Sequence, residues 1–360
     1  MAVDGWIFFT VAALLAIGIT MVLSTSYLYA QERFGDGTYF FRKQLIAAGI
    51  GFVGLLIAAA TPVEVYRKLA YPLMAAVLLV LVLLLIPAIG ATRGGARRWL
   101  ILGGFAFQPA ELAKLSLLLY LARSLAKKTD KMASFWLGVL PHLVVGGLFI
   151  GLIVLEPDLG TAVTLGLLLI LTLFIAGAKL THLVYLGLAA VPVVAVAIMG
   201  AEYRLRRMMT FLDPWRDASK SGFQIIQSYI AFGSGQLLGR GLGESRQKMF
   251  YLPEAHTDFI FSVIGEEMGL LGAFGVLALF AVIIVRGLKL ASRIEEPFSQ
   301  YLAFGLTTLL GLQALIHMSV VMGLLPTKGL VLPFISYGGS AMMVNLVEAG
   351  MLLGLSRGRK

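Results

Sequence analysis

The segment from residue 252 to 267 carries the densest group of chemically reactive side chains in a chain that is otherwise mostly hydrocarbon. A helix starting at Asp258 would place Asp258 and Glu266 on one face. Carboxylates at a lipid boundary are costly unless they face protein or water, so this segment is a candidate site. Glu254 and His256 lie next to Asp258, and carboxylate repulsion with partial burial would raise the pKa of Asp258 toward that of a general base. The alternative is that Asp258 only caps the helix that follows.

A second candidate lies at residues 108–114, where Gln-Pro-Ala-Glu-Leu-Ala-Lys begins an apolar run. Proline suits the first turn of a helix, where its missing N–H costs little. Glu111 and Lys114 are then three residues apart and able to pair. The pair is either a salt bridge that lets two charges exist near lipid, or a site in which Lys114 meets an anionic headgroup while Glu111 orients it. The two interpretations are compatible.

Two further segments bring charge or irregular backbone to the membrane. At residues 156–161, Asp158 could cap a helix after Pro157 ends the preceding one. Alternatively, Glu156 or Asp158 binds a cation or the substrate. Residues 325–340 hold two prolines and paired glycines, a pattern typical of re-entrant backbone that lines a water cavity or is buried in protein.

The composition identifies the scaffold that must position these residues. Of the 360 residues, 59% are hydrophobic and 13% are charged, and the mean hydropathy is +0.90. Soluble domains carry about 45–50% apolar and about 25% charged residues, so we expect an all-α polytopic membrane protein. Its net charge of +10 does not call for a nucleic-acid partner, because basic residues also collect in cytoplasmic loops. The absence of cysteine excludes disulfides.

Apolar segments of about 20 residues predict ten membrane spans in a single domain covering residues 1–360. The spans lie near residues 6–27, 44–60, 69–90, 109–126, 135–154, 158–177, 182–200, 267–287, 299–323 and 339–356. The first span looks uncleaved because no positive region precedes it. Thirteen Lys and Arg residues lie on the side of the termini and seven in the short loops opposite. This bias predicts that both termini are cytoplasmic.

The loop of residues 201–266, between spans seven and eight, is then the long extracytoplasmic segment. It opens with Arg204, Arg206 and Arg207 and continues into a candidate surface helix at residues 222–230. Its glycine-rich part lacks a preceding strand and a Gly-Lys-Ser/Thr sequence, so no nucleotide cofactor is expected. We expect a substrate-binding loop, since backbone without Cβ atoms lets a ligand approach closely.

Several motifs together resemble the SEDS (shape, elongation, division and sporulation) family of FtsW- and RodA-like membrane proteins. The motifs are GARRW (95–99), QPAELAK (108–114), PDLGT (157–161), LPEAHTDFIF (252–261), GEE (265–267) and LPFISYGGS (332–340). They occur in family order over essentially the whole chain. The resemblance implies a peptidoglycan glycosyltransferase that polymerises lipid II at the outer face of the cytoplasmic (inner) membrane, for cell division or elongation.

The resemblance also implies roles for individual residues. Asp258 matches the family's essential aspartate and is the expected catalytic base. The expected substrate-binding residues are Glu111, Lys114, Arg98, Arg204, Arg207, Glu254, His256 and Ser336. A divalent cation, Mg or Mn, is a possible cofactor, with Glu156 and Asp158 as candidate ligands. The implied partners are a class B penicillin-binding protein, lipid II with its polyprenyl-linked glycan, and other membrane proteins of the division or elongation machinery.

Two other functions fit part of the pattern. A lipid II flippase would also use broken spans and intramembrane charges, but it does not need a long outer loop that ends in a carboxylate cluster. A non-catalytic scaffold for the transpeptidase would leave Glu111, Lys114 and Asp258 without a purpose. The motifs after residue 239 favour the division branch, whereas the brief termini would equally suit the elongation branch.

Overall fold

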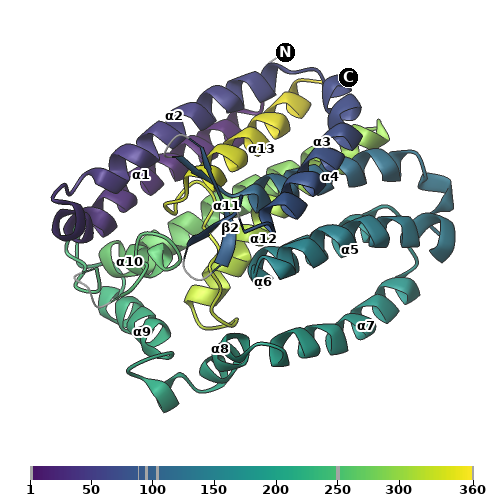
Figure 1. The fold of residues 1–360 in the computed structure, drawn as a ribbon. Helices are drawn as coiled ribbons and strands as arrows, with labels where there is room; N and C mark the ends of the chain where they lie inside the picture. Colours follow the sequence, from purple (N-terminus) through teal and green to yellow (C-terminus); the bar gives the residue numbers. More distant parts are fainter. Residues whose placement is uncertain (1–2, 88, 94–95, 103–104, 249–251, 359–360) are drawn as a thin grey trace.

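The computed structural model describes residues 3–87, 89–93, 96–102, 105–248 and 252–358. The chain forms a bundle of long helices, with shorter helices and a small sheet gathered at one end (Figure 1). A helix lies at each of the ten ranges predicted to span the membrane. These are α1 (Gly5–Phe34), α2 (Tyr39–Ala60), α3 (Val63–Leu84), α4 (Pro109–Ala126), α5 (Leu140–Leu155), α6 (Leu159–Ile175), α7 (Leu180–Met199), α11 (Gly269–Ala291), α12 (Pro297–Val321) and α13 (Gly339–Arg357).

In the described part of the chain, eight helical segments are long and apolar enough to cross a membrane, counting α5 together with the π-helical turn η2 (Phe135–Val139) before it. The other two of the ten are α6, with 17 residues, and α4, which carries Glu111, Lys114 and Arg123. The chain is therefore a multi-pass membrane protein. The count of ten spans stays a prediction.

Both termini lie at the same end of the bundle (Figure 1). The backbone N–H of Asp4 donates to Oγ of Ser356 at 2.9 Å. The Asp4 carboxylate also accepts a hydrogen bond from Nη2 of Arg286, near the end of α11, at 2.6 Å. Arg67 of α3 pairs with Glu296, just before α12, at 2.8 Å. The 3-10 turn η1 (Thr129–Lys131) follows α4 in the chain.

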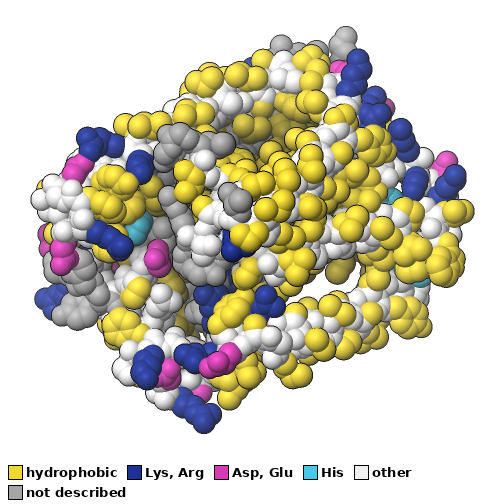
Figure 2. Space-filling model, in the orientation of Figure 1, with side chains coloured by type: hydrophobic (Ala, Val, Ile, Leu, Met, Phe, Trp, Pro, Cys, Tyr) yellow, Lys and Arg dark blue, Asp and Glu magenta, His cyan; other side chains and the backbone are white. Residues whose placement is uncertain are grey.

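The helices differ in how deeply they are packed. α4, α12 and α13 form the interior, with most of their residues buried. α7 lies at the edge of the bundle (Figure 1), and Leu183 is its one buried residue. Apolar side chains cover the long flank of the bundle, while charged side chains gather at its two ends (Figure 2). This distribution is the one that a lipid bilayer around the flank requires.

The segment of residues 201–266 is largely helical. It contains α8 (Glu202–Leu212), the 3-10 turn η3 (Pro214–Asp217), α9 (Phe223–Gly235) and α10 (Ile260–Glu267). The predicted surface helix is present as α9, but its Ser228 is buried and bonds Ser262 of α10 at 2.7 Å.

A three-stranded antiparallel sheet, which the sequence pattern did not predict, lies between α3 and α4. Its strands are β1 (Ala91–Arg93), β2 (Ala96–Leu102) and β3 (Phe105–Phe107), in the order β1-β2-β3. Trp99 pairs with Ala91 and Leu100 with Phe107. Arg98 lies on β2, which packs against α3 and α4.

Candidate active site

Asp258 lies in a series of turns and not in a helix. α10 begins at Ile260, with Phe259 in the capping position. The predicted helix from Asp258 onward and the alternative that Asp258 caps it are therefore both wrong. The cause is local: Thr257 N–H and Phe259 N–H both donate to the carbonyl of Glu254, at 3.1 and 3.3 Å, which closes a tight turn around Asp258.

The loop before α13 holds this turn in place from the other side. Ser336 Oγ donates to the carbonyl of Thr257 at 2.8 Å, and Tyr337 N–H donates to the carbonyl of His256 at 2.9 Å. The His256 ring is buried, with its centroid 4.7 Å from that of Phe40 and 5.7 Å from that of Tyr337. Burial lowers the pKa of His256, and Glu254 partly opposes this. Ser336 and His256 thus position the backbone beside Asp258.

The Asp258 carboxylate is in an environment that favours its protonated form. Burial raises its pKa to about 7, and the negative charge of Glu254 adds to the increase. The guanidinium groups of Arg98 and Arg207 lower the pKa, although not enough to cancel the effect of burial. A Cβ atom added at Gly329 would lie 3.2 Å from Oδ2 of Asp258, so the backbone at Gly329 runs alongside the carboxylate.

Asp158 anchors Arg98 near Asp258. Its Oδ1 accepts the N–H of Thr161 at 3.0 Å and caps α6, as the sequence predicts. Its Oδ2 lies 3.6 Å from Nη1 of Arg98 and accepts Nε2 of Gln108 at 3.2 Å. One carboxylate therefore joins the sheet, the start of α4 and the start of α6, and it also raises the pKa of Asp258 through its charge.

Two more ionisable groups complete this cluster. Glu156 is buried, and neither of its carboxylate oxygens has a hydrogen-bond partner among the described residues. Burial and the charge of Asp158 raise the pKa of Glu156 to about 8. Burial lowers the pKa of Lys328, whereas Asp158 opposes that change. The sequence analysis singled out the segment around Lys328 but did not assign this lysine to the site. The feature that could have indicated it is its position next to Gly329.

The three arginines of α8 have different interaction partners. Arg204 is held by backbone, with Nη1 at 2.9 Å from the carbonyl of Ala197 and Nη2 at 3.4 Å from that of Val154. Arg206 pairs with Glu202 at 2.8 Å. Arg207 is exposed and is the α8 side chain whose charge acts on Asp258.

Glu111 and Lys114 are brought together, as predicted, but inside the bundle. They are 4% and 1% exposed and pair at 2.8 Å. Lys114 also donates to Oε1 of Gln313 on α12 at 2.5 Å. On α13, the buried Glu348 interacts electrostatically with this pair, and its carboxylate has no hydrogen-bond partner in the described parts of the chain. Because the predicted substrate-binding pair is already engaged by protein, its position favours a role in holding α4 to α12.

The fold and the site define a class: a helical multi-pass membrane protein with a carboxylate-centred polar site at one end of its bundle. Residues 5–360 match the family profile FtsW/RodA/SpoVE, described as a cell cycle protein. The chain is 47% identical over 344 residues to the probable peptidoglycan glycosyltransferase FtsW of Geobacter sulfurreducens, covering 96% of this chain and 92% of the relative. It is 40% identical to the stage V sporulation protein E of Bacillus subtilis, covering 96% and 94%.

Solved structures agree with these relatives. A chain of a peptidoglycan synthase complex that coordinates polymerisation and crosslinking matches with a TM-score of 0.82 and 32% identity, over 100% of this chain and 99% of that one. The rod-shape-determining protein RodA of Thermus thermophilus matches with a TM-score of 0.74 and 29% identity, over 100% and 98%. The chain belongs to the FtsW/RodA/SpoVE family, which confirms the resemblance to the SEDS proteins.

Proposed function

We propose that this membrane protein polymerises lipid II with Asp258 as its general base. The chain is a peptidoglycan glycosyltransferase by its relatives and its fold. The observation that carries the proposed mechanism is the Asp258 carboxylate, partly buried among cationic side chains, with a pKa raised to about 7. A base with a pKa near the working pH is unprotonated often enough to act and basic enough to accept a proton.

In the proposed reaction, Asp258 takes the proton of the acceptor sugar's 4-hydroxyl. The hydroxyl oxygen forms a bond to the anomeric carbon of the donor chain, and the bond from that carbon to the pyrophosphate oxygen breaks with inversion. Polyprenyl pyrophosphate leaves as an anion, so it needs cationic groups and no separate acid. Arg98, Arg207 and Lys328, which all act electrostatically on this cluster, are placed to stabilise its charge.

A divalent cation fits this site as a component held jointly with the substrate. Among the described residues, no group of three or more His, Cys, Asp and Glu side chains lies close enough to hold a metal ion. Mg²⁺ typically uses one or two protein carboxylates together with substrate phosphates. The unpaired carboxylate of Glu156, beside Asp158, supports a role for these two residues in holding it. Such an ion would neutralise charge on the leaving pyrophosphate.

The proposed location is the cytoplasmic membrane, with both termini in the cytoplasm and the Asp258 site outside. The common end of the two termini and the excess of Lys and Arg on that side support this orientation. The proposed partner is a class B penicillin-binding protein, contacted through its single membrane helix. The similarity to a chain of a complex that coordinates polymerisation with crosslinking supports this choice.

The test is polymerisation of lipid II by purified protein, with and without a class B penicillin-binding protein, in the presence of Mg²⁺. We expect glycan ladders from the wild type and a decrease of about 10²–10⁴ in rate for Asp258→Ala, because a general base contributes about that factor. Retention of more than a tenth of the wild-type rate would remove Asp258 from the mechanism. No ladder under any condition, together with lipid II crossing a liposome membrane, would instead support a flippase.

A further inference from the structure

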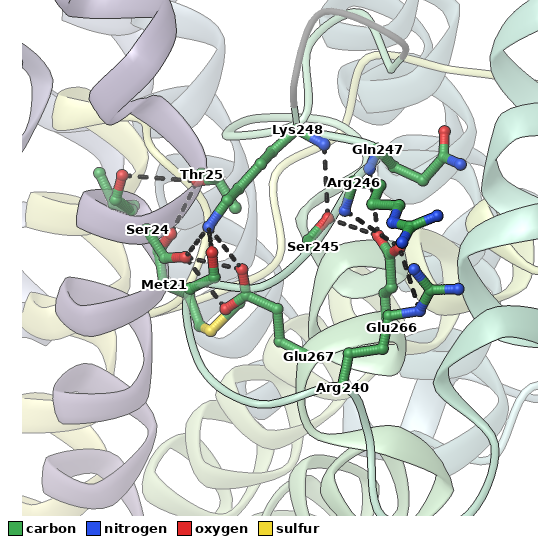
Figure 3. A network of polar contacts seen from close by, with 12 residues as sticks. Met21, Ser24, Thr25, Arg240, Ser245, Arg246, Gln247, Lys248, Glu266 and Glu267 are labelled. Atoms are coloured by element: carbon green, nitrogen blue, oxygen red, sulfur yellow. Dashed lines mark hydrogen bonds and ion pairs between the residues drawn. The ribbon is translucent and has the colours of Figure 1, made fainter.

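Glu266 and Glu267, at the end of α10, hold the glycine-rich part of the long loop against the helix that follows Asp258 (Figure 3). The Glu266 side chain is fully buried. It accepts four hydrogen bonds, from Ser245 Oγ, from the N–H groups of Arg246 and Gln247 at 3.2 and 3.3 Å, and from Ser234 Oγ at 3.2 Å. Arg240 lies 4.0 Å away as a weaker ionic partner.

Glu267 ties the same loop to the first span. Its carboxylate accepts Ser24 Oγ of α1 at 2.8 Å and Nζ of Lys248 at 2.9 Å. Nζ of Lys248 also donates to the carbonyl of Gly243 at 2.5 Å. The charges of Lys248 and Glu267 are almost completely removed from solvent, and a buried charge is tolerated only when its partners satisfy it.

The backbone repeats this connection. The N–H groups of Arg240 and Gly241 donate to the carbonyls of Glu266 and Glu267, each at 3.0 Å. A Cβ atom at Gly239 would lie 2.2 Å from the carbonyl oxygen of Glu267, so the two backbones are in direct contact. The last turn of α10 therefore binds residues 239–248 through side chains and main chain together.

This arrangement fixes both sides of the segment that carries Asp258. On one side, Gln247, whose N–H is held by Glu266, accepts the N–H of Leu252 through its carbonyl at 2.8 Å. On the other side, α10 begins two residues after Asp258 and carries Glu266 in its last turn. One carboxylate thus sets the distance between the start and the end of the Leu252–Phe259 turn.

We propose that Glu266 is a positioning residue for Asp258, which it holds in place by fastening residues 245–247 to α10. This proposal rests on the proposed function of Asp258. The hydrogen-bond donors to Glu266 are Ser234 of α9 and residues 245–247, so its effect reaches the reaction through the geometry of Asp258. A shift of about 1 Å in a reacting group decreases a rate by about 10², which makes the placement of Asp258 measurable.

The test compares Glu266→Gln with Glu244→Gln, a carboxylate on the same loop that is exposed. The glutamine keeps one acceptor oxygen but replaces the other with an N–H₂ group that cannot accept from the loop N–H donors, so it weakens the clamp at nearly constant size. In the full-length protein with its class B partner, we expect kcat for lipid II polymerisation to fall by about 10- to 100-fold, with KM within threefold. Glu244→Gln should behave as the wild type in both constants.

A second variant keeps the test decisive if Glu266→Gln does not fold. Ser245→Ala removes one donor and leaves the carboxylate, and we expect kcat between that of the wild type and that of Glu266→Gln, again with unchanged KM. Hydrogen–deuterium exchange should rise in residues 252–258 of both variants. Wild-type kcat in the folded variants, or a change confined to KM, would overturn the proposal. If Asp258→Ala itself stays active, the proposed function fails, and that result is distinct from a wild-type Glu266→Gln.

Discussion

At the scale of single residues, Asp258 owes its chemistry to opposing influences. Burial and Glu254 raise its pKa, whereas Arg98 and Arg207 lower it, which leaves the value at about 7. Without the arginines the pKa would be higher and a smaller fraction of the carboxylate would be deprotonated at neutral pH. Without burial the carboxylate would be ionised but less basic. In the proposed mechanism the same arginines serve both the base and the leaving pyrophosphate.

This balance predicts the pH dependence of the reaction. Because the base must be deprotonated, kcat should rise as the pH increases through about 7 and be lost below it. Arg207→Gln removes a charge that lowers the pKa of Asp258, so the midpoint of this limb should move to higher pH. Kinetics of lipid II polymerisation between pH 5 and 9 measure the shift.

Arg206→Gln is the matched control, since Arg206 lies on the same helix and pairs with Glu202. Its profile should coincide with that of the wild type. A midpoint that moves equally in both variants would mean that the general charge of α8, and not Arg207 itself, sets the protonation of the base.

At the scale of elements, the interior of the bundle contains a buried ion pair on α4 whose lysine also donates a hydrogen bond to α12. Lys114 bonds both Glu111 and Gln313 while almost completely buried. Lys114→Met would leave the Glu111 carboxylate without its cation, and we expect a loss of about 3–5 kcal/mol in the free energy of unfolding. The double variant Glu111→Gln/Lys114→Met should recover most of this loss. Denaturant unfolding of purified protein measures both.

The exposed Lys131→Met, in the turn η1 that follows α4, provides the control and should change stability by less than about 0.5 kcal/mol. If the double variant is stable but does not polymerise, the pair also takes part in the reaction. If Lys114→Met is as stable as the wild type, the pair does not hold α4 to α12.

The elements also show what the sequence could predict. All ten long helices follow from runs of apolar residues, because hydrocarbon thickness sets their length. The turn at Asp258 did not follow, since the apolar run after it looked helical and the competing hydrogen bonds to the carbonyl of Glu254 are a matter of local geometry. The sheet that carries Arg98 was hidden for a similar reason: three short strands leave too little alternation to detect.

The site likewise contains residues that the sequence predicted and residues that it did not. Asp258, Glu254, Arg98 and Asp158 were predicted and do interact. Lys328 was not assigned to the site, because its proximity depends on a re-entrant segment whose path no local pattern specifies. Gln313 was missed because a neutral amide in an apolar span is not a conspicuous signal.

At the scale of the whole molecule, orientation is testable because the chain contains no cysteine. A single Glu244→Cys substitution on the long loop or Glu295→Cys near the termini introduces one exposed thiol without altering a buried group. In intact spheroplasts, a membrane-impermeant maleimide should label the Glu244→Cys protein and not the Glu295→Cys protein.

Permeabilised cells supply the control, since both thiols should then react. Labelling of Glu295→Cys alone in intact cells would place the Asp258 site in the cytoplasm. That outcome would be incompatible with polymerisation at the outer face of the membrane.

The buried contact between α4 and α12 also has a consequence for biosynthesis. Lys114 and Gln313 are 199 residues apart in the chain, so α4 enters the membrane long before its partner helix is made. A lone lysine at the centre of a helix costs about 2.5–3.5 kcal/mol on insertion. Glu111, one turn away on the same helix, pairs with it from the start. The ion pair would therefore keep the Lys114 charge compensated within α4 until α12 emerges from the ribosome.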